Sequence, residues 1–142
     1  MKIASYNING INGRLANLLR WLKEAKPDVV CLQELKSTDA LFPEEALMKA
    51  GYHAIWSGQK SWNGVAILSR YGEIKQTIKG MPGDEEDVQS RYIEGFINGI
   101  VIGCLYLPNG NPWPGDKFTY KLNWMKRLNS HAKRLLSFDL PV

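Results

Sequence analysis

The sequence predicts an α/β fold, and two observations carry that prediction. Residues 2–33 contain strand, helix and strand signals in succession, which is the pattern of a βαβ unit. The chain has 142 residues, of which 44% are hydrophobic and 23% are charged, as in an ordinary globular domain. These values exclude a disordered or fibrous chain. The length suffices for one domain whose core needs neither a disulfide nor a structural metal.

The N-terminal unit brings two strand ends together. A short apolar strand over residues 2–6 ends at the turn-prone segment Asn7–Gly10, and a buried strand over residues 28–33 ends at Glu34. The helix between them stops at Pro27, and its apolar residues recur at helical spacing: Leu15, Leu18, Leu19 and Leu22. Strands joined in this way run parallel, so we expect Asn7 and Glu34 side by side at one edge of the sheet.

The remaining segments predict further strands and two more helices. A short helix is expected at residues 43–50, and strands are expected over residues 52–56, 65–69, 74–78, 92–97 and 100–107. The pair Asn98-Gly99 is a strong hairpin signal between the last two strands. A Pro- and Gly-rich loop over residues 109–115 precedes a long helix that begins at Asp116.

The long helix carries an apolar stripe and most of the basic residues in the C-terminal part of the chain. We expect four apolar side chains of this stripe to be buried, namely Phe118, Leu122, Met125 and Leu128, while the basic side chains mainly face solvent. The net charge of +4 is compatible with a polyanionic partner. The acidic run Asp84–Asp87 reads as a surface loop.

The sequence also predicts the compartment and the state of the cysteines. No apolar run approaches the ~18 residues that a membrane span needs, and no signal peptide precedes the first strand, so a cytoplasmic protein is expected. Cys31 and Cys104 each lie in an apolar run without CxxC spacing, which predicts two free buried thiols.

Polar residues at three strand ends are the candidate site. Glu34 follows a buried strand, and its partner is either a divalent cation such as Mg²⁺ or the neighbouring Lys36. Tyr106 ends a third apolar strand and either packs at the rim of the core or faces the site. Trp62 and Asn63 form either a simple hairpin tip or a loop that stacks against bases.

Other site classes find little support in the sequence. There is no GxGxxG and no GxxxxGK[ST] motif, which disfavours dinucleotide binders and P-loop enzymes. There is no GxSxG motif, and His53 and His131 are the only histidines, which disfavours a serine triad.

Four segments carry a family resemblance: Ser5–Gly10, Pro27–Lys36, Gly58–Ala66 and Tyr106–Asn111. In this order they resemble the exodeoxyribonuclease III family of bacteria, within the endonuclease/exonuclease/phosphatase superfamily. The resemblance implies a DNase I-like fold, a two-sheet α/β sandwich of which this chain supplies about one mixed sheet with flanking helices, so that the inner face of that sheet lacks its partner. It implies a Mg²⁺-dependent DNA phosphodiesterase, for which Mn²⁺ can substitute, acting in DNA repair on double-stranded DNA at abasic sites and 3′ ends. It implies no membrane and no protein partner.

The same resemblance implies roles for individual residues. Glu34 is similar to the family's Mg²⁺-binding glutamate, and Asn7 to the asparagine beside it. Tyr106 resembles the active-site tyrosine, and Asn109 the polar residue that approaches the target phosphate. The residues in the places that meet DNA are Lys36, Trp62, Asn63 and Asn109. Asn9 stands where some relatives carry an aspartate, so a second carboxylate is absent there.

Family members also carry a Gly-Asp-x-Asn motif and a Ser-Asp-His motif, and neither is present in residues 1–142. We therefore expect a single incomplete domain over residues 1–142 that is truncated before the Gly-Asp-x-Asn motif. Two alternatives stay open. One is a catalytically inactive fragment with at most weak nucleic-acid or metal binding, and the other is a different branch of the superfamily, such as a lipid or phosphoinositide phosphatase.

The absent motifs lead to a prediction about the 142-residue chain by itself. We expect little or no nuclease activity, because losses within a concerted set of catalytic groups cost orders of magnitude in rate. The measurement is incision of an abasic-site duplex by purified chain with Mg²⁺ or with chelator, with Glu34→Ala as the contamination control. Robust Mg²⁺-dependent incision that this substitution abolishes would contradict the prediction.

Overall fold

The computed structural model describes residues 1–142, which form seven strands, three α-helices and two short 3-10 helices. In chain order the elements are β1 (Ile3–Asn7), η1 (Asn12–Arg14), α1 (Leu15–Ala25), β2 (Val29–Gln33), η2 (Asp39–Leu41), α2 (Glu44–Lys49), β3 (His53–Ser57), β4 (Val65–Ser69), β5 (Lys75–Lys79), β6 (Tyr92–Ile97), β7 (Ile100–Leu105) and α3 (Asp116–Leu136). The expected elements are all present, with bounds that differ by one or two residues. None of the helices is both long and apolar enough to cross a membrane.

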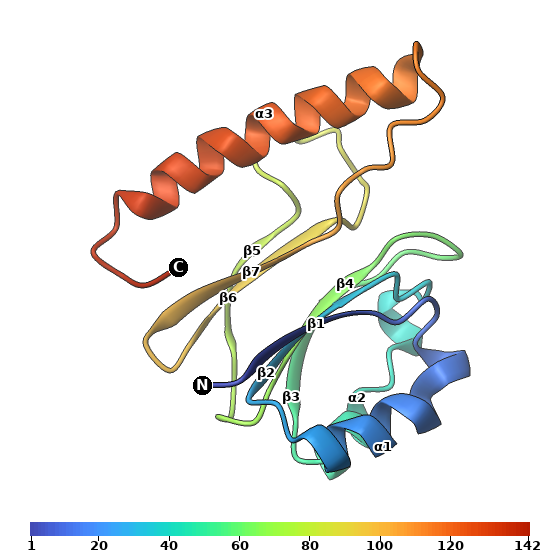
Figure 1. Ribbon diagram of the computed structural model, residues 1–142, viewed down its shortest axis with the longest axis vertical. Coiled ribbons are helices and arrows are strands. Elements are labelled where there is room, and N and C mark those ends of the chain that lie inside the picture. The colour runs from blue at the N-terminus through green and yellow to red at the C-terminus, as the bar shows by residue number, and fades with distance from the viewer.

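The strands form two sheets that pack face to face between layers of helix (Figure 1). The first sheet has the strand order β1-β2-β4-β3, and the second has the order β5-β6-β7. In Figure 1, α1 and α2 cover the outer side of the four-stranded sheet, while α3 crosses the outer side of the three-stranded sheet. The architecture is therefore an α/β sandwich.

The first sheet is mixed, as the βαβ pattern predicts. β1 and β2 run parallel, with Ile3 opposite Val29 and Asn7 opposite Gln33, whereas β4 is antiparallel to both β2 and β3. Because Asn7 ends β1 level with Gln33, the residue after β2, Glu34, emerges beside Asn7. The hairpin signal Asn98-Gly99 is also confirmed, since β6 and β7 pair on either side of it.

The expectation of a single sheet with an uncovered inner face is wrong in that detail. The two inner faces form one core, in which Val29, Cys31, Val65 and Ile67 of the first sheet meet Ile93, Ile97, Ile102 and Cys104 of the second. The strands β5 to β7 pair only with one another. Their sheet buries its apolar surface by packing that face against the first sheet, which stabilises the fold. Only the edge strand β1 extends past this cover, and Ile3 on it is 52% exposed. Both cysteines are free and buried, as predicted.

The helix α3 docks through a different face from the one the sequence predicts. Trp124, His131 and Leu135 are its buried residues, whereas Leu122 and Met125 are each 44% exposed. Trp124 packs with Tyr92 and Met81 in a small core of its own. The apolar stripe therefore does not predict the buried face of α3. Trp124 and His131 lie outside the stripe, and their burial determines the rotation of the helix.

The buried face of α3 is fixed by polar contacts as well. Glu94 on β6 is 3% exposed, and its carboxylate accepts hydrogen bonds from Thr77, Tyr92 and the His131 ring at 2.6 to 2.7 Å. Burial acts to raise the pKa of Glu94, but these hydrogen bonds outweigh it and hold the pKa below the usual glutamate value. Glu94 therefore stays ionised within the layer between the sheet and the helix.

A second buried ion pair joins α3 to the acidic loop. Arg127 donates to Asp87, whose side chain is 6% exposed and also accepts from the Tyr120 hydroxyl at 3.0 Å. The expected acidic surface loop and the mainly solvated basic face of the helix are confirmed for most of their residues, since Asp84–Glu86 and most of the basic side chains are exposed, and Asp87 and Arg127 are the exceptions. The sequence could not reveal the pair, because the two residues lie forty positions apart.

The docking of α3 leads to a stability prediction. His131→Ala should lower the free energy of unfolding by about 3 kcal/mol, because it leaves the buried Glu94 carboxylate short of a partner. Urea unfolding followed by circular dichroism measures this. His53→Ala, at the half-buried histidine on β3, is the matched control and should cost about 1 kcal/mol or less. Equal losses in the two variants would contradict the assigned role of His131.

Candidate active site

The site is built around Glu34, which leaves the end of β2 in an unusual backbone conformation. Glu34 and Lys36 have φ values of +56° and +49°, in the left-handed region that non-glycine residues rarely adopt. Four backbone hydrogen bonds hold Glu34, Leu35 and Lys36, which form the corner after β2. The carbonyls of Glu34 and Leu35 accept from Gly10 and Ile11, and the N–H groups of Leu35 and Lys36 donate to Gly64 and Asn63. The corner is thus clamped between two loops.

Three side chains converge on the Glu34 carboxylate from different segments. The Asn7 amide donates to Oε1 at 2.9 Å from the end of β1, and the Tyr106 hydroxyl donates to the same oxygen at 2.6 Å from beyond the end of β7. The Lys36 ammonium lies 3.2 Å from Oε2. The structure therefore brings together Asn7, Glu34, Lys36 and Tyr106, as expected at the carboxyl edge of the sheet.

These contacts set the charge of the site. The hydrogen bond from Asn7 and then that from Tyr106 lower the pKa of Glu34, and Lys36 adds to the shift against the opposing effect of burial. Burial and the Glu34 charge both raise the pKa of Tyr106 above its ordinary value. At neutral pH the site thus holds a glutamate anion next to a protonated phenol.

Asn9 and Lys36 extend the network on the side of β1. The Lys36 ammonium donates to Asn9 Oδ1 at 2.5 Å, and the Asn9 backbone N–H donates to Asn7 Oδ1 at 3.1 Å. Asn9 therefore offers an amide oxygen at the position where a second carboxylate is absent. Arg14 donates to the backbone carbonyl of Asn9 and fixes this loop.

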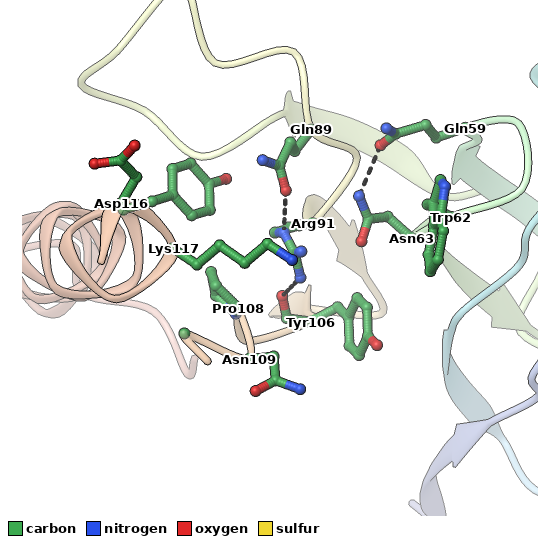
Figure 2. Close-up of a pocket in the computed structure, with 12 residues that line it drawn as sticks. Gln59, Trp62, Asn63, Gln89, Arg91, Tyr106, Pro108, Asn109, Asp116 and Lys117 are labelled. Atoms are coloured by element: carbon green, nitrogen blue, oxygen red, sulfur yellow. Dashed lines mark hydrogen bonds between the residues drawn. The ribbon is translucent and has the colours of Figure 1, made fainter. Parts of the chain in front are cut away.

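A polar groove of about 640 Å³ begins at Tyr106 (Figure 2). Four of the residues assigned from the sequence line it, namely Tyr106, Trp62, Asn63 and Asn109. Trp62 is 69% exposed and Asn109 is exposed, but Asn63 is only 9% exposed and donates its amide to Gln59 at 2.9 Å. The structure thus places Trp62 and Asn109 on the groove surface and Asn63 mostly beneath it.

The groove also contains functional candidates that the sequence reasoning missed. Arg91 lies 5.1 Å from the centre of the Tyr106 ring and donates to the Tyr106 carbonyl at 3.3 Å and to Gln89 at 2.7 Å. Lys117, near the start of α3, lines the same groove, and Asp116 is its one acidic lining residue. The one feature of the sequence that could have indicated Arg91 as a site residue is its position directly before the strand β6. The cations indicate that the groove suits an anionic ligand.

The donor set fits a hard divalent cation with few protein ligands. The structure contains no group of three or more His, Cys, Asp or Glu side chains placed to share an ion, and Glu34 is the carboxylate among the contacts of Asn7, Tyr106 and Lys36. Carboxylate and amide oxygens are available from Glu34 and Asn7, and Mg²⁺ is commonly held by one or two carboxylates, several waters and substrate phosphates. Lys36 occupies the second oxygen of Glu34 and would have to share it with such an ion.

Fold and site together define a class of protein: a two-sheet α/β sandwich with an oxygen-rich, cation-lined site at the sheet edge. The chain belongs to the Endonuclease/Exonuclease/phosphatase family, whose model matches residues 4–142. Both the family resemblance and the DNase I-like α/β sandwich are thereby confirmed.

The sequence is similar to two bacterial exodeoxyribonucleases. It is 43% identical over 110 residues to exodeoxyribonuclease III of Haemophilus influenzae, covering 78% of this chain and 40% of that protein. It is 30% identical over 139 residues to an exodeoxyribonuclease of Bacillus subtilis, covering 95% of this chain and 53% of that protein. The chain therefore spans about half the length of these relatives, or less.

Solved structures are similar throughout the chain. An AP endonuclease from Archaeoglobus fulgidus superposes with a TM-score of 0.90 at 38% identity, covering 98% of this chain and 52% of that one. A 3′ phosphatase from Neisseria, bound to a product DNA hairpin, superposes with a TM-score of 0.92 at 36% identity, covering 96% of this chain and 53% of that one.

The network around Glu34 leads to a prediction about its titration. Tyr106→Phe should raise the pKa of Glu34 toward the ordinary glutamate value, because one of the two hydrogen bonds to Oε1 is lost. Because the pKa of Glu34 is lower in the folded chain than in the unfolded chain, the ionised carboxylate stabilises the fold at pH values above the ordinary glutamate pKa. This stability is lost as the pH falls through the pKa of the folded chain. The variant, with a smaller pKa difference, should therefore lose less stability in acid. NMR titration of the Glu34 carboxyl carbon measures the shift. Tyr71→Phe, at an exposed tyrosine, is the control, and an equal shift in both variants would refute the assignment.

Proposed function

We propose that this chain carries the metal- and phosphate-binding part of a DNA phosphodiesterase of exodeoxyribonuclease III type, active in DNA repair at abasic sites and 3′ ends. The observation that supports it most directly is the Glu34 carboxylate, held ionised by Asn7 and Tyr106 at the mouth of a groove that Arg91 and Lys117 line. Named relatives support the DNA substrate, since they include an AP endonuclease and a 3′ phosphatase bound to a DNA hairpin.

Each residue of the site has a role in this proposal. Glu34 and Asn7 hold the divalent cation, which we take to be Mg²⁺ with Mn²⁺ as a substitute. When bound, the cation stabilises negative charge on the phosphate during attack by water. Tyr106 orients the Glu34 carboxylate through its hydroxyl, and the Asn109 amide donates to a phosphate oxygen.

The DNA backbone follows the groove in the same proposal. Lys36 binds a phosphate once the cation shares Glu34, and Trp62 stacks on an unpaired base or on the sugar of an abasic site. Asn63 supports the Trp62 loop from beneath. The substrate is double-stranded DNA, in which an abasic site or a 3′ end leaves room for such stacking.

The proposal is tested by metal binding and DNA binding to the 142-residue chain. We expect Glu34→Gln to weaken Mn²⁺ binding, measured by electron paramagnetic resonance, by at least about tenfold, because the carboxylate on which Asn7 and Tyr106 converge is lost. Glu45→Gln is the matched control, since that glutamate is 85% exposed on α2 and should leave binding unchanged. Equal Mn²⁺ affinities for the two variants would overturn the metal site.

The DNA arm uses Trp62→Ala and a duplex with one abasic-site analogue. Affinity for this duplex should fall about tenfold, because stacking on one base is worth about 1–3 kcal/mol. The control is Trp113→Ala, because Trp113 is 70% exposed and does not line the groove. Trp21 is unsuitable as a control, because it packs against the core. A larger loss in Trp113→Ala than in Trp62→Ala would contradict the assigned path of the DNA.

A further inference from the structure

The loop that carries Trp62 is tied to both sheets through one side chain, that of Gln59. Its Oε1 accepts a hydrogen bond from the Asn63 amide at 2.9 Å, which Figure 2 shows, and another from the Ser90 backbone N–H at 3.1 Å. Gln59 follows β3 of the first sheet, and Ser90 leads into β6 of the second. One oxygen atom therefore joins the loop to a segment that lies thirty-one positions away.

The same loop holds the corner that carries the proposed metal ligand. The Asn63 carbonyl accepts from the Lys36 N–H at 3.0 Å, and the Gly64 carbonyl accepts from the Leu35 N–H at 3.2 Å. The Gly64 N–H in turn donates to the Ser90 carbonyl at 2.9 Å. A continuous set of hydrogen bonds therefore runs from Gln59 to the residues directly after Glu34.

The backbone of this loop does not adopt its shape by default. Ser61 and Asn63, two non-glycine residues, have φ values of +64° and +51° in the left-handed region, and Gly64 has a φ of +92°, which glycine adopts readily and other residues do not. Gly64 approaches Leu35 so closely that an added Cβ would lie 2.7 Å from the Leu35 Cβ. Conformations of this kind persist only where surrounding contacts hold them, and the contact that reaches the Asn63 side chain is Gln59.

We propose that Gln59 is a positioning residue of the active site. Through Asn63 and Ser90 it fixes the loop of residues 59–64, whose carbonyls hold Leu35 and Lys36 and so aim the Glu34 carboxylate and the Lys36 ammonium. This inference rests on the proposed function for the importance of Glu34. Gln59 needs no contact with DNA or metal in this role. Asn63 is held by Gln59 through its side-chain amide and holds Lys36 through its backbone carbonyl.

Two pairs of substitutions separate positioning from general support of the fold. Gln59→Met keeps the size of the side chain and removes the acceptor, whereas Gln59→Glu keeps an oxygen that can accept from both N–H donors. Asn63→Gly tolerates the positive φ and removes the amide donor together with the rest of the side chain, which provides a second variant if Gln59→Met folds poorly. Gln76→Met, at an exposed glutamine on β5, is the matched control.

The measurements are amide hydrogen exchange by NMR and Mn²⁺ affinity of the 142-residue chain. In Gln59→Met and Asn63→Gly, exchange at Leu35 and Lys36 should accelerate at least about fivefold while amides within β2 keep their rates. Mn²⁺ affinity should fall about tenfold, as for partners that orient a metal ligand. Gln59→Glu and Gln76→Met should stay within about twofold of the parent chain in both measurements.

Other results overturn the proposal. Unchanged exchange at Leu35 and Lys36 in Gln59→Met, equal acceleration throughout β2, or a Gln59→Glu variant that behaves like Gln59→Met would each show that the Gln59 oxygen does not position the corner. If the parent chain binds no Mn²⁺ while the exchange pattern holds, the proposed metal site fails and the positioning of the corner by Gln59 stands.

Discussion

The hydrogen bond from Tyr106 to Glu34 is the interaction on which the site depends. It joins the two sheets, because Glu34 follows β2 of the first sheet and Tyr106 follows β7 of the second, and its donor and acceptor oxygens are 2.6 Å apart. The buried core between the sheets brings these strands together, and Cys104 on β7 donates through its thiol to the Leu32 carbonyl on β2 at 3.3 Å. Sheet packing therefore supplies the Tyr106 hydrogen bond, which after that of Asn7 is the second cause of the lowered pKa of Glu34.

The backbone at Glu34 adds a second constraint. A non-glycine residue with positive φ costs about 1–3 kcal/mol, and the corner contains two of them in Glu34 and Lys36. Hydrogen bonds from two separate loops offset that cost, and the carboxylate gains an orientation that an extended strand could not give it. Strain concentrated in this way at one polar corner supports a functional assignment more strongly than the identity of a single glutamate does.

Local patterns in the sequence predict the parts of the site that depend on neighbouring segments. The parallel pairing of β1 and β2 follows from a βαβ pattern, and with it the contact between Asn7 and Glu34. The packing of the second sheet could not be predicted in this way, because the sequence pattern of β5–β7 does not indicate which surface these strands pack against. The burial of Asn63 was equally hidden, since it depends on an amide oxygen from Gln59 in a loop without regular structure.

The errors on α3 have one physical cause and bear on the groove. Sequence reasoning places charged groups in solvent, whereas this helix is docked by two buried polar clusters, Glu94 with His131 and Asp87 with Arg127. Such pairs add little net stability over apolar packing, but they penalise every rotation of the helix that leaves a charge buried and unpaired. Because Lys117 lies on the first turn of α3, the rotation that these pairs select also places it in the lining of the groove. The polar clusters on the outer face of the second sheet thus help to shape the groove at its end.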